Sequence, residues 1–363
     1  MTHAPRNAGL DLLRCLAILC VLVSHVGQAV PWWFGWRWGQ RIPAGIGGIG
    51  SYGVTLFFVL SGFLVGGIAL RAMRPEPTWR TVAVFLTRRW MRTVPLYYVA
   101  LAVFLATSPP AAHLAAHVVR YATFTQNLLG DMPPDHWFSV SWSLTVEEWF
   151  YLLFGLCGLG LATRLPAGAA AWIMIVLLAA VPTWLRWTAP SALYFAYADP
   201  LWFDALAFGV AVARITQQRR VPPAAAVLAG LAGAWCAGVV LTNRLILPLA
   251  AYNTLMPTVM ASSAALLLPL AMLWRTGSGR LSRAIAWVST RSYGLYLFHF
   301  AVLGPANAFV VHQIDAHPRY GATGVPGWTL LATIGAVLVL PCAMAELGHR
   351  LVERPFMRLR PRQ

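Results

Sequence analysis

The chain has 363 residues, of which 59% are hydrophobic and only 10% charged. A soluble domain carries roughly a quarter charged residues. So few charges are insufficient to cover a soluble fold of this size, whereas a lipid bilayer needs no such cover. A net charge of +16 would also fit a nucleic-acid binder, but no nucleic-acid motif or aromatic and basic groove accompanies it, so we expect no nucleic-acid partner.

Hydrophobic stretches of about 20 residues, long enough to cross a hydrocarbon core of about 30 Å, recur along the whole chain. They are expected to be helices, because a segment in lipid must satisfy its backbone internally, and the strands of a β-barrel would be shorter and alternating. The sequence therefore predicts an all-α, polytopic integral membrane protein with about ten transmembrane helices. The predicted spans are 10–30, 44–70, 94–109, 138–162, 167–188, 194–213, 223–242, 245–273, 285–312 and 326–347.

The orientation follows from arginine, which supplies all 27 positive charges. If the N-terminus is inside, 20 arginines fall on the cytoplasmic side and 6 on the outer side, with Arg14 within the first span. This excess predicts that both termini are cytoplasmic. We expect a single transmembrane domain over residues 1–363, with no soluble C-terminal domain and no cleaved signal peptide. The five cysteines lie in apolar spans without metal-ligand spacing, so no metal site is expected.

Ionisable side chains inside a span are costly and are therefore candidates for function. Arg14 and His25 in the first span are eleven residues apart, a net rotation of about 20° on a helix, so they share one face about 16 Å apart. Asp11, three residues before Arg14, is a candidate ion-pair partner. The alternative is that Arg14 only reaches for the interface and His25 only packs.

Two further spans contain polar candidates. Glu147 and Glu148 are adjacent in the fourth span, and Tyr151 follows Glu147 by one turn. Because Glu148 points about 100° away from Glu147, only one carboxylate can serve a given face. The ninth span contains Tyr293, Tyr296 and His299, with His299 one turn after Tyr296. Asp199 and Asp204 in the sixth span are weaker candidates, interpreted as interhelical partners of arginines.

A basic segment precedes the third span and includes Arg88, Arg89 and Arg92. On a helical turn Arg89 and Arg92 face the same way, in a geometry suited to clamping a phosphate. The alternative is that these arginines only set the topology. Arg14, expected at the same level of the membrane, favours a site for a polyphosphate ligand.

These segments resemble the acyltransferase-three family of bacterial integral membrane O-acyltransferases. RCLAILCVLVSH is similar to the family's motif of an arginine and a histidine eleven positions apart. The segments that resemble its further motifs, in the family's order, are GVTLFFVLSGF, RRWMRTVPLYY, SWSLTVEEWFYLLF, FDALAFGVAVA, SYGLYLFH and HRLVERP. The resemblance covers roughly residues 10–356.

The resemblance implies a membrane enzyme that takes an acyl group, usually acetyl, from cytoplasmic acyl-CoA. The implied acceptor is a hydroxyl of a surface or secreted glycan; a macrolide or other small molecule is the alternative acceptor. No permanently bound cofactor is expected, since acetyl-CoA is a substrate. The implied location is the bacterial cytoplasmic (inner) membrane, with a periplasmic or glycan-assembly protein as a further partner. A transporter or flippase is the alternative from another class, but no internal repeat supports it.

The resemblance and the residue map together assign roles. Arg14, Arg88, Arg89 and Arg92 are the expected ligands of the acyl-CoA phosphates, and His25 is the expected general base on the acceptor hydroxyl. Glu147, or else Glu148, is expected to orient His25. Tyr151, Tyr293 and His299 are candidates to stabilise the oxyanion. An acyl-histidine intermediate stays open as a second route.

Overall fold

The protein is a bundle of long helices. The computed structural model describes residues 7–33, 45–72, 78–108, 117–128, 137–188, 202–241, 249–275, 279–317 and 325–361, and within these ranges it contains no strand. The first seven elements are α1 (Ala8–Trp33), α2 (Gly45–Ser61), η1 (Gly62–Gly66), α3 (Gly67–Ala72), α4 (Trp79–Thr107), α5 (His117–Ala122) and η3 (Ser139–Ser141). The remaining elements are α6 (Trp142–Ala162), α7 (Ala167–Thr188), α8 (Phe203–Gln218), α9 (Pro223–Leu241), α10 (Leu249–Leu273), α11 (Arg280–Ala316), α13 (Gly327–Gly348), η5 (His349–Glu353) and α14 (Arg354–Arg358).

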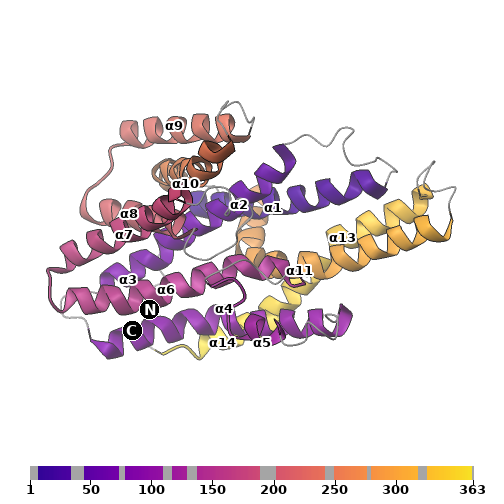
Figure 1. The fold of residues 1–363 in the computed structure, drawn as a ribbon, viewed down its shortest axis with the longest axis horizontal. Coiled ribbons are helices and arrows are strands. Elements are labelled where there is room, and N and C mark those ends of the chain that lie inside the picture. The colour runs from indigo at the N-terminus through magenta and orange to yellow at the C-terminus, as the bar shows by residue number, and fades with distance from the viewer. Residues whose placement is uncertain are drawn as a thin grey trace.

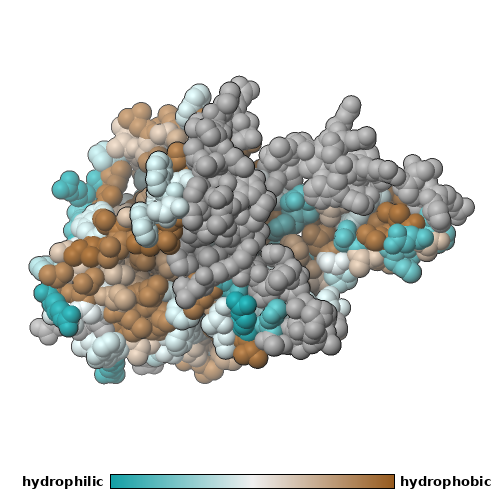
Figure 2. All heavy atoms as spheres, in the orientation of Figure 1, coloured by the Kyte–Doolittle hydropathy of each residue, from teal (hydrophilic) through white to brown (hydrophobic). Residues whose placement is uncertain are grey.

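The predicted all-α, multi-pass architecture is confirmed. Nine helices in the described part of the chain are long and apolar enough to cross a membrane. The tenth long helix, α8, matches the end of the predicted sixth span but has only 16 residues. Residues 189–201, including Asp199, lie outside the described part of the chain. Large apolar side chains such as Trp184 and Trp235 are exposed on the bundle, as contact with lipid requires. Figure 2 shows hydrophobic residues, in brown, over the left part of the visible face.

The largest difference from the predicted spans is the start of α4. The sequence predicted a basic segment followed by a span beginning at residue 94, whereas the helix begins at Trp79 and includes the basic residues. Thr78 caps it, with its hydroxyl accepting a hydrogen bond from the backbone N–H of Thr81. Arginine is a good helix former, so a capped helix continues through these residues at the edge of the apolar layer. Arg88, Arg89 and Arg92 are therefore held on a rigid helix.

The backbones of α8 and of α2 with its continuation η1 lie in close contact, because both sides of the contact contain glycine. A Cβ placed on Gly62 would lie 2.0 Å from the carbonyl oxygen of Leu206, and one on Gly209 would lie 2.1 Å from that of Val59. Only glycine allows two helix backbones to approach so closely. The helix leaves α geometry at the same point, because η1 is a π-helical segment. A π segment often marks a functional site, and η1 borders the cavity described below.

The start of α4 and the last described residues lie near one another along the lower edge of the bundle (Figure 1). The side chain of Asn7 donates to the carbonyl of Met272 at the end of α10. Arg88 near the start of α4 donates to the carbonyl of Pro361. These contacts hold the starts of α1 and α4 against the end of α10 and the last described residues.

Candidate active site

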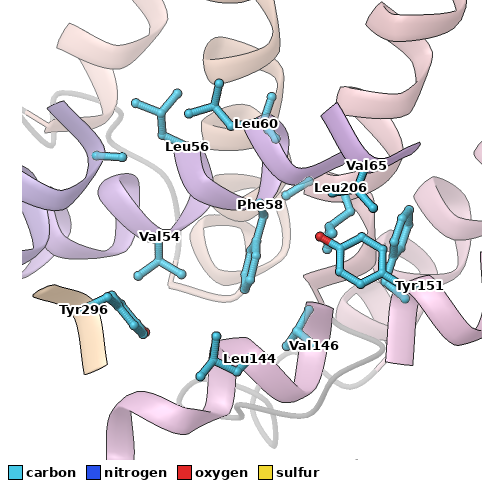
Figure 3. Close-up of a cluster of buried hydrophobic side chains, with 14 of the residues drawn as sticks. Val54, Leu56, Phe58, Leu60, Val65, Leu144, Val146, Tyr151, Leu206 and Tyr296 are labelled. Atoms are coloured by element: carbon cyan, nitrogen blue, oxygen red, sulfur yellow. The ribbon is translucent and has the colours of Figure 1, made fainter. Parts of the chain in front are cut away.

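A cavity lies between α1, α2, η1, α4, α6 and α11. We call it the arginine cavity because three arginines line it. Its lining residues are Arg14, Val54, Phe57, Phe58, Leu60, Ser61, Leu64, Val65, Arg89, Arg92, Thr93, Ser143, Leu144, Glu147, Ser292, Tyr293 and Tyr296. Figure 3 shows part of its apolar wall, with Val54 and Phe58 of α2 facing Leu144 of α6 and Tyr296 of α11. The cavity thus combines an apolar wall with guanidinium groups.

Arg89 is turned from α4 into the bundle, where it meets Glu147 of α6. Its Nη2 donates to Oε2 of Glu147 at 2.6 Å, and the side chains are only 9% and 14% exposed. The guanidinium also lies over the ring of Tyr151, 4.5 Å from the centroid. The Tyr151 hydroxyl contacts Glu147 and Ser61. This buried network fixes Arg89 and Glu147 as part of the cavity wall, because each charge compensates the other.

Arg14 lies near the start of α1 and faces α11. Its Nη1 donates to the hydroxyl of Ser289 at 3.4 Å and lies 3.9 Å from Asp11. Ser289 in turn donates to Asp11 at 2.6 Å. The predicted contact between Asp11 and Arg14 is confirmed, and the shared serine holds the guanidinium against the cavity.

Positive charge continues from the cavity to the end of the bundle. Arg92 lines the cavity and is exposed, while Arg88 is engaged by the carbonyl of Pro361 and is not a lining residue. Next to it, partial burial and then the positive charges of Arg92 and Arg88 lower the pKa of Arg360 to about 10. Burial is the larger cause of this lowering, and the neighbouring arginine charges add to it. Arg88, Arg92 and Arg360 thus gather positive charge at this end of the bundle.

A second cavity lies further along α1 and α11. We call it the histidine cavity; its lining residues are His25, Gln28, Ala29, Phe300, Leu303, Gly304, Asn307 and Val311. On α1 the arginine cavity is lined at Arg14 and the histidine cavity from His25 onward. On α11 the change falls between Tyr296 and Phe300. The two cavities therefore follow one another along α1 and α11.

His25 and His299 lie at this junction and contact each other. The Nδ1 of His25 is 3.0 Å from the Nε2 of His299, and the rings are stacked with centroids 5.1 Å apart. His25 is half-buried and lines the histidine cavity, whereas His299 is buried. The ring of Tyr296 lies beside His299, and its hydroxyl contacts Ser143 at 2.7 Å. Tyr296 thus reaches the arginine cavity from the histidine pair.

The contacts of His299 determine where the protons of both rings lie. Its Nδ1 is 2.7 Å from the carbonyl oxygen of Tyr296 and 3.2 Å from that of Leu295. Carbonyl oxygens only accept, so Nδ1 of His299 is protonated and its Nε2 is an acceptor in the neutral ring. His25 must then donate from its own Nδ1. The Nε2 of His25 is left with a lone pair, which is the form a general base requires.

Not all of the predicted site residues meet at His25. The structure brings His25 to His299, while Glu147, expected to orient His25, contacts Arg89 and Tyr151 instead. The sequence could not distinguish these partners, because Glu147 and His299 are both polar residues within spans. Glu148 does not line either cavity; it is buried and accepts a hydrogen bond from Thr93.

The tyrosines and the sixth-span aspartate have well-defined positions. Tyr293 lines the arginine cavity and donates to the carbonyl of Thr93, and Tyr151 is fully buried behind Glu147. Asp204 is buried in an ion pair with Arg186 at 2.5 Å, which confirms its predicted role as an interhelical partner.

Sequence reasoning did not single out Ser143, Gln28 or Asn307. Gln28 follows His25 by three residues, so helical spacing alone was a signal that both share a face. Asn307 follows Tyr296 and Phe300 along one stripe of α11, but nothing in the sequence placed that stripe beside α1.

Comparison with known proteins accounts for the ordered motifs. Residues 7–345 match the model of a family described as an acyltransferase domain. The chain belongs to the acyltransferase-three family. The match covers nearly the whole described bundle, including both cavities, so the chain is a multi-pass membrane protein of the acyltransferase class.

Three curated relatives are distant in sequence. The chain is 25% identical to the peptidoglycan O-acetyltransferase OatA of Listeria monocytogenes over 96% of its own length, and 25% identical to the putative peptidoglycan O-acetyltransferase YrhL of Bacillus subtilis over 98%. It spans 55% of the length of each. It is 26% identical to the acyltransferase MdmB of Streptomyces mycarofaciens, covering 98% of this chain and 92% of that protein. No solved structure matches the chain significantly.

Proposed function

We propose that this protein transfers an acyl group, in the first instance acetyl, from acyl-CoA to a hydroxyl group of a surface or secreted glycan. The observation that carries the proposal is the position of the pair formed by His25 and His299 between two cavities that follow one another along α1 and α11. A donor in one cavity and an acceptor in the other would bring their reacting atoms to the same imidazole. Transfer across a membrane needs such an arrangement, because the two substrates arrive from opposite sides.

The arginine cavity is the proposed donor site. Acyl-CoA carries a diphosphate and a further phosphate at one end and a thioester at the end of a long flexible arm. Arg14 and Arg92 would bind the phosphates by charge-assisted hydrogen bonds, with Arg88 and Arg360 adding to the positive potential. The arm would then lie along the apolar wall around Phe58 and Leu144, which leads toward Tyr296.

The histidine pair is the proposed catalytic centre. The Nε2 of His25 would take the proton of the acceptor hydroxyl as its oxygen attacks the thioester carbonyl. Collapse of the tetrahedral intermediate breaks the carbon–sulfur bond, and the proton on His25 passes to the leaving CoA thiolate. His299 accepts the hydrogen bond from Nδ1 of His25 and keeps that ring in the required tautomer. The hydroxyl of Tyr296, which contacts Ser143, would be the donor that stabilises the oxyanion.

A glycan acceptor is supported by two relatives whose names specify peptidoglycan O-acetylation. The location that fits is the cytoplasmic membrane of a bacterium, with the arginine end of the bundle and both termini in the cytoplasm. The arginines gathered around the starts of α4 and α11 and around α14 support this orientation.

Acetyl-CoA binding and glycan acetylation together test the proposal. The wild-type protein, purified in detergent, should bind acetyl-CoA, and an Arg92→Ala variant should bind it more weakly. Arg164, an exposed arginine in the turn after α6, supplies the matched control, because Arg164→Ala removes the same charge away from both cavities. Base-labile acetate on envelope glycans should disappear in a deletion strain and return with the wild-type gene. If acetyl-CoA does not bind and glycan acetate is unchanged by deletion, the proposed function is wrong.

A further inference from the structure

The histidine cavity has a regular construction that the donor site does not explain. Phe300, Gly304, Asn307 and Val311 are spaced four, three and four residues apart, so they form one stripe of α11. His25, Gln28 and Ala29 form the facing stripe of α1. The cavity is therefore lined by two continuous helix faces, and it begins at the catalytic imidazole.

The side-chain amides of Gln28 and Asn307 lie on these stripes, and each is hydrogen-bonded within the protein by a different end. Gln28 is bound through its nitrogen, and Asn307 through its oxygen. Gln28 uses its Nε2 to donate to the backbone and hydroxyl oxygens of Ser24, at 3.0 and 3.1 Å. Its amide oxygen has no hydrogen-bond partner among the described residues. Asn307 uses its Oδ1 to accept from Nε1 of Trp33 at 3.1 Å, and its NH2 group has no acceptor in that part of the chain. Each amide is thus anchored by one end and offers the other.

An acceptor oxygen, a pair of amide N–H donors and an aromatic ring together match a sugar. Neighbouring hydroxyls of a sugar ring both donate and accept hydrogen bonds, and the apolar face of such a ring packs on aromatic side chains. The ring of Phe300 stands edge-on to His25, with centroids 4.8 Å apart, and so forms a wall next to the base. A purely apolar ligand that covered both amides would leave them without hydrogen-bond partners, which is unfavourable.

We propose that the histidine cavity is the acceptor site, and that Gln28 and Asn307 select the acceptor by hydrogen-bonding the hydroxyls next to the one that is acylated. This inference rests on the proposed transferase function and assigns its second substrate to a place. The acceptor is a sugar residue of a glycan, entering from the end of the bundle opposite to Arg14. Its reacting hydroxyl faces the Nε2 of His25.

Gly304 provides a substitution that fills the cavity without disturbing the packing. A Cβ at Gly304 would meet no atom within 4 Å, and the residue lines the cavity and is exposed. Leucine at this position would extend into the space proposed for the acceptor. Gly335 on α13 is the matched control, because a Cβ there also meets nothing within 4 Å and the residue lines neither cavity.

The experiment compares Gly304→Leu and Gly335→Leu in a deletion strain, by base-labile acetate in the envelope glycan fraction and, for each purified variant, by the affinity for acetyl-CoA. Gly304→Leu should lower glycan acetylation by about tenfold or more, the equivalent of the usual cost of overfilling a site, while acetyl-CoA affinity stays at the wild-type value. Gly335→Leu should change neither. If Gly304→Leu gives normal glycan acetylation, the histidine cavity is not the acceptor site. If the wild-type protein itself does not bind acetyl-CoA, the proposed function is wrong and this inference falls with it.

A second readout does not depend on activity. The variant Gly304→Cys should react with a membrane-impermeant maleimide in right-side-out vesicles beyond the level of the wild-type chain, whose own cysteines provide the background. It should not gain reactivity in inverted vesicles. Reactivity only in inverted vesicles would overturn entry of the acceptor from this end. Asn307→Asp, which keeps the oxygen that accepts from Trp33 but removes the NH2 donors, should lower glycan acetylation, and unchanged acetylation would remove Asn307 from the proposal.

Discussion

His25 of α1 and His299 of α11 are joined by a hydrogen bond of 3.0 Å between Nδ1 and Nε2. His299 is fixed from behind by the carbonyls of Leu295 and Tyr296. The pair resembles the general arrangement in which a catalytic base is oriented by a second group, except that the orienting group is itself a neutral imidazole. A neutral orienting group suits the interior of a membrane, because a carboxylate there would need compensation by a positive charge.

Replacing His25 should separate binding from chemistry. His25→Ala removes the proposed base but leaves the arginine cavity intact, so acetyl transfer should fall by about 10²–10⁴-fold, the usual contribution of general acid–base catalysis. The affinity for acetyl-CoA and the amount of folded protein in the membrane should stay the same. Near-normal turnover by His25→Ala would remove the general-base role.

Replacing His299 tests its role as a positioning residue. In His299→Gln the amide can still present an acceptor to Nδ1 of His25, whereas in His299→Leu it cannot. We expect His299→Leu to lower the turnover number by about 10–100-fold, as losses of orienting partners often do, with little change in the KM for acetyl-CoA. His299→Gln should recover part of the loss. The two variants should also differ in the pH dependence of turnover, and equal profiles and rates would indicate that His299 only fills space.

Removing the charge of Arg92 should weaken the binding of acetyl-CoA without unfolding the protein. Arg92 lines the cavity and is exposed, so its loss leaves no buried charge behind. A hydrogen bond between charged groups contributes about 1.5–3 kcal/mol, so Arg92→Ala should raise the dissociation constant of acetyl-CoA by about 10–100-fold. Titration of the purified variant measures this directly. Acetate transfer at saturating acetyl-CoA should be close to normal.

Helical periodicity was sufficient to predict the shared face of Arg14 and His25. Both side chains contact α11 in the structure, at Ser289 and His299 respectively. The prediction succeeded because the angle between two residues of one helix depends only on their separation in sequence. The same argument correctly separated Glu147, which lines the arginine cavity, from Glu148, which does not.

The sequence did not show which helices contact each other. The partner of His25 depends on which helices are neighbours, and the composition of a membrane span says little about that, because nearly all spans are apolar on every side. Glu147 was therefore expected beside His25, whereas α6 presents it to Arg89 of α4. The start of α4 was also misjudged, because charge was read as the end of a helix when it only marks the end of the apolar layer.

The ion pair between Arg89 and Glu147 makes a different prediction from that for Arg92. Because both side chains are largely buried, Arg89→Ala would leave the carboxylate of Glu147 uncompensated, at a cost of about 3–5 kcal/mol to folding. We expect a lower thermal unfolding temperature as well as weaker acetyl-CoA binding. Combining Arg89→Ala with Glu147→Gln should restore much of the stability without restoring the donor affinity. If the double variant is no more stable than Arg89→Ala, the two side chains do not stabilise each other.

The buried pair of Arg186 and Asp204 provides the contrasting structural case. Asp204 is fully buried, and its Oδ2 accepts from Arg186 at 2.5 Å and from the hydroxyl of Thr258 at 2.9 Å, which connects α7, α8 and α10. No residue of this group lines either cavity. Asp204→Ala should therefore destabilise the bundle by about 3–5 kcal/mol, because a buried guanidinium loses its counter-charge, and thermal unfolding in detergent measures that loss. The fraction that stays folded should bind acetyl-CoA with wild-type affinity, whereas a selective loss of binding without a change in unfolding temperature would place this pair in the donor site instead.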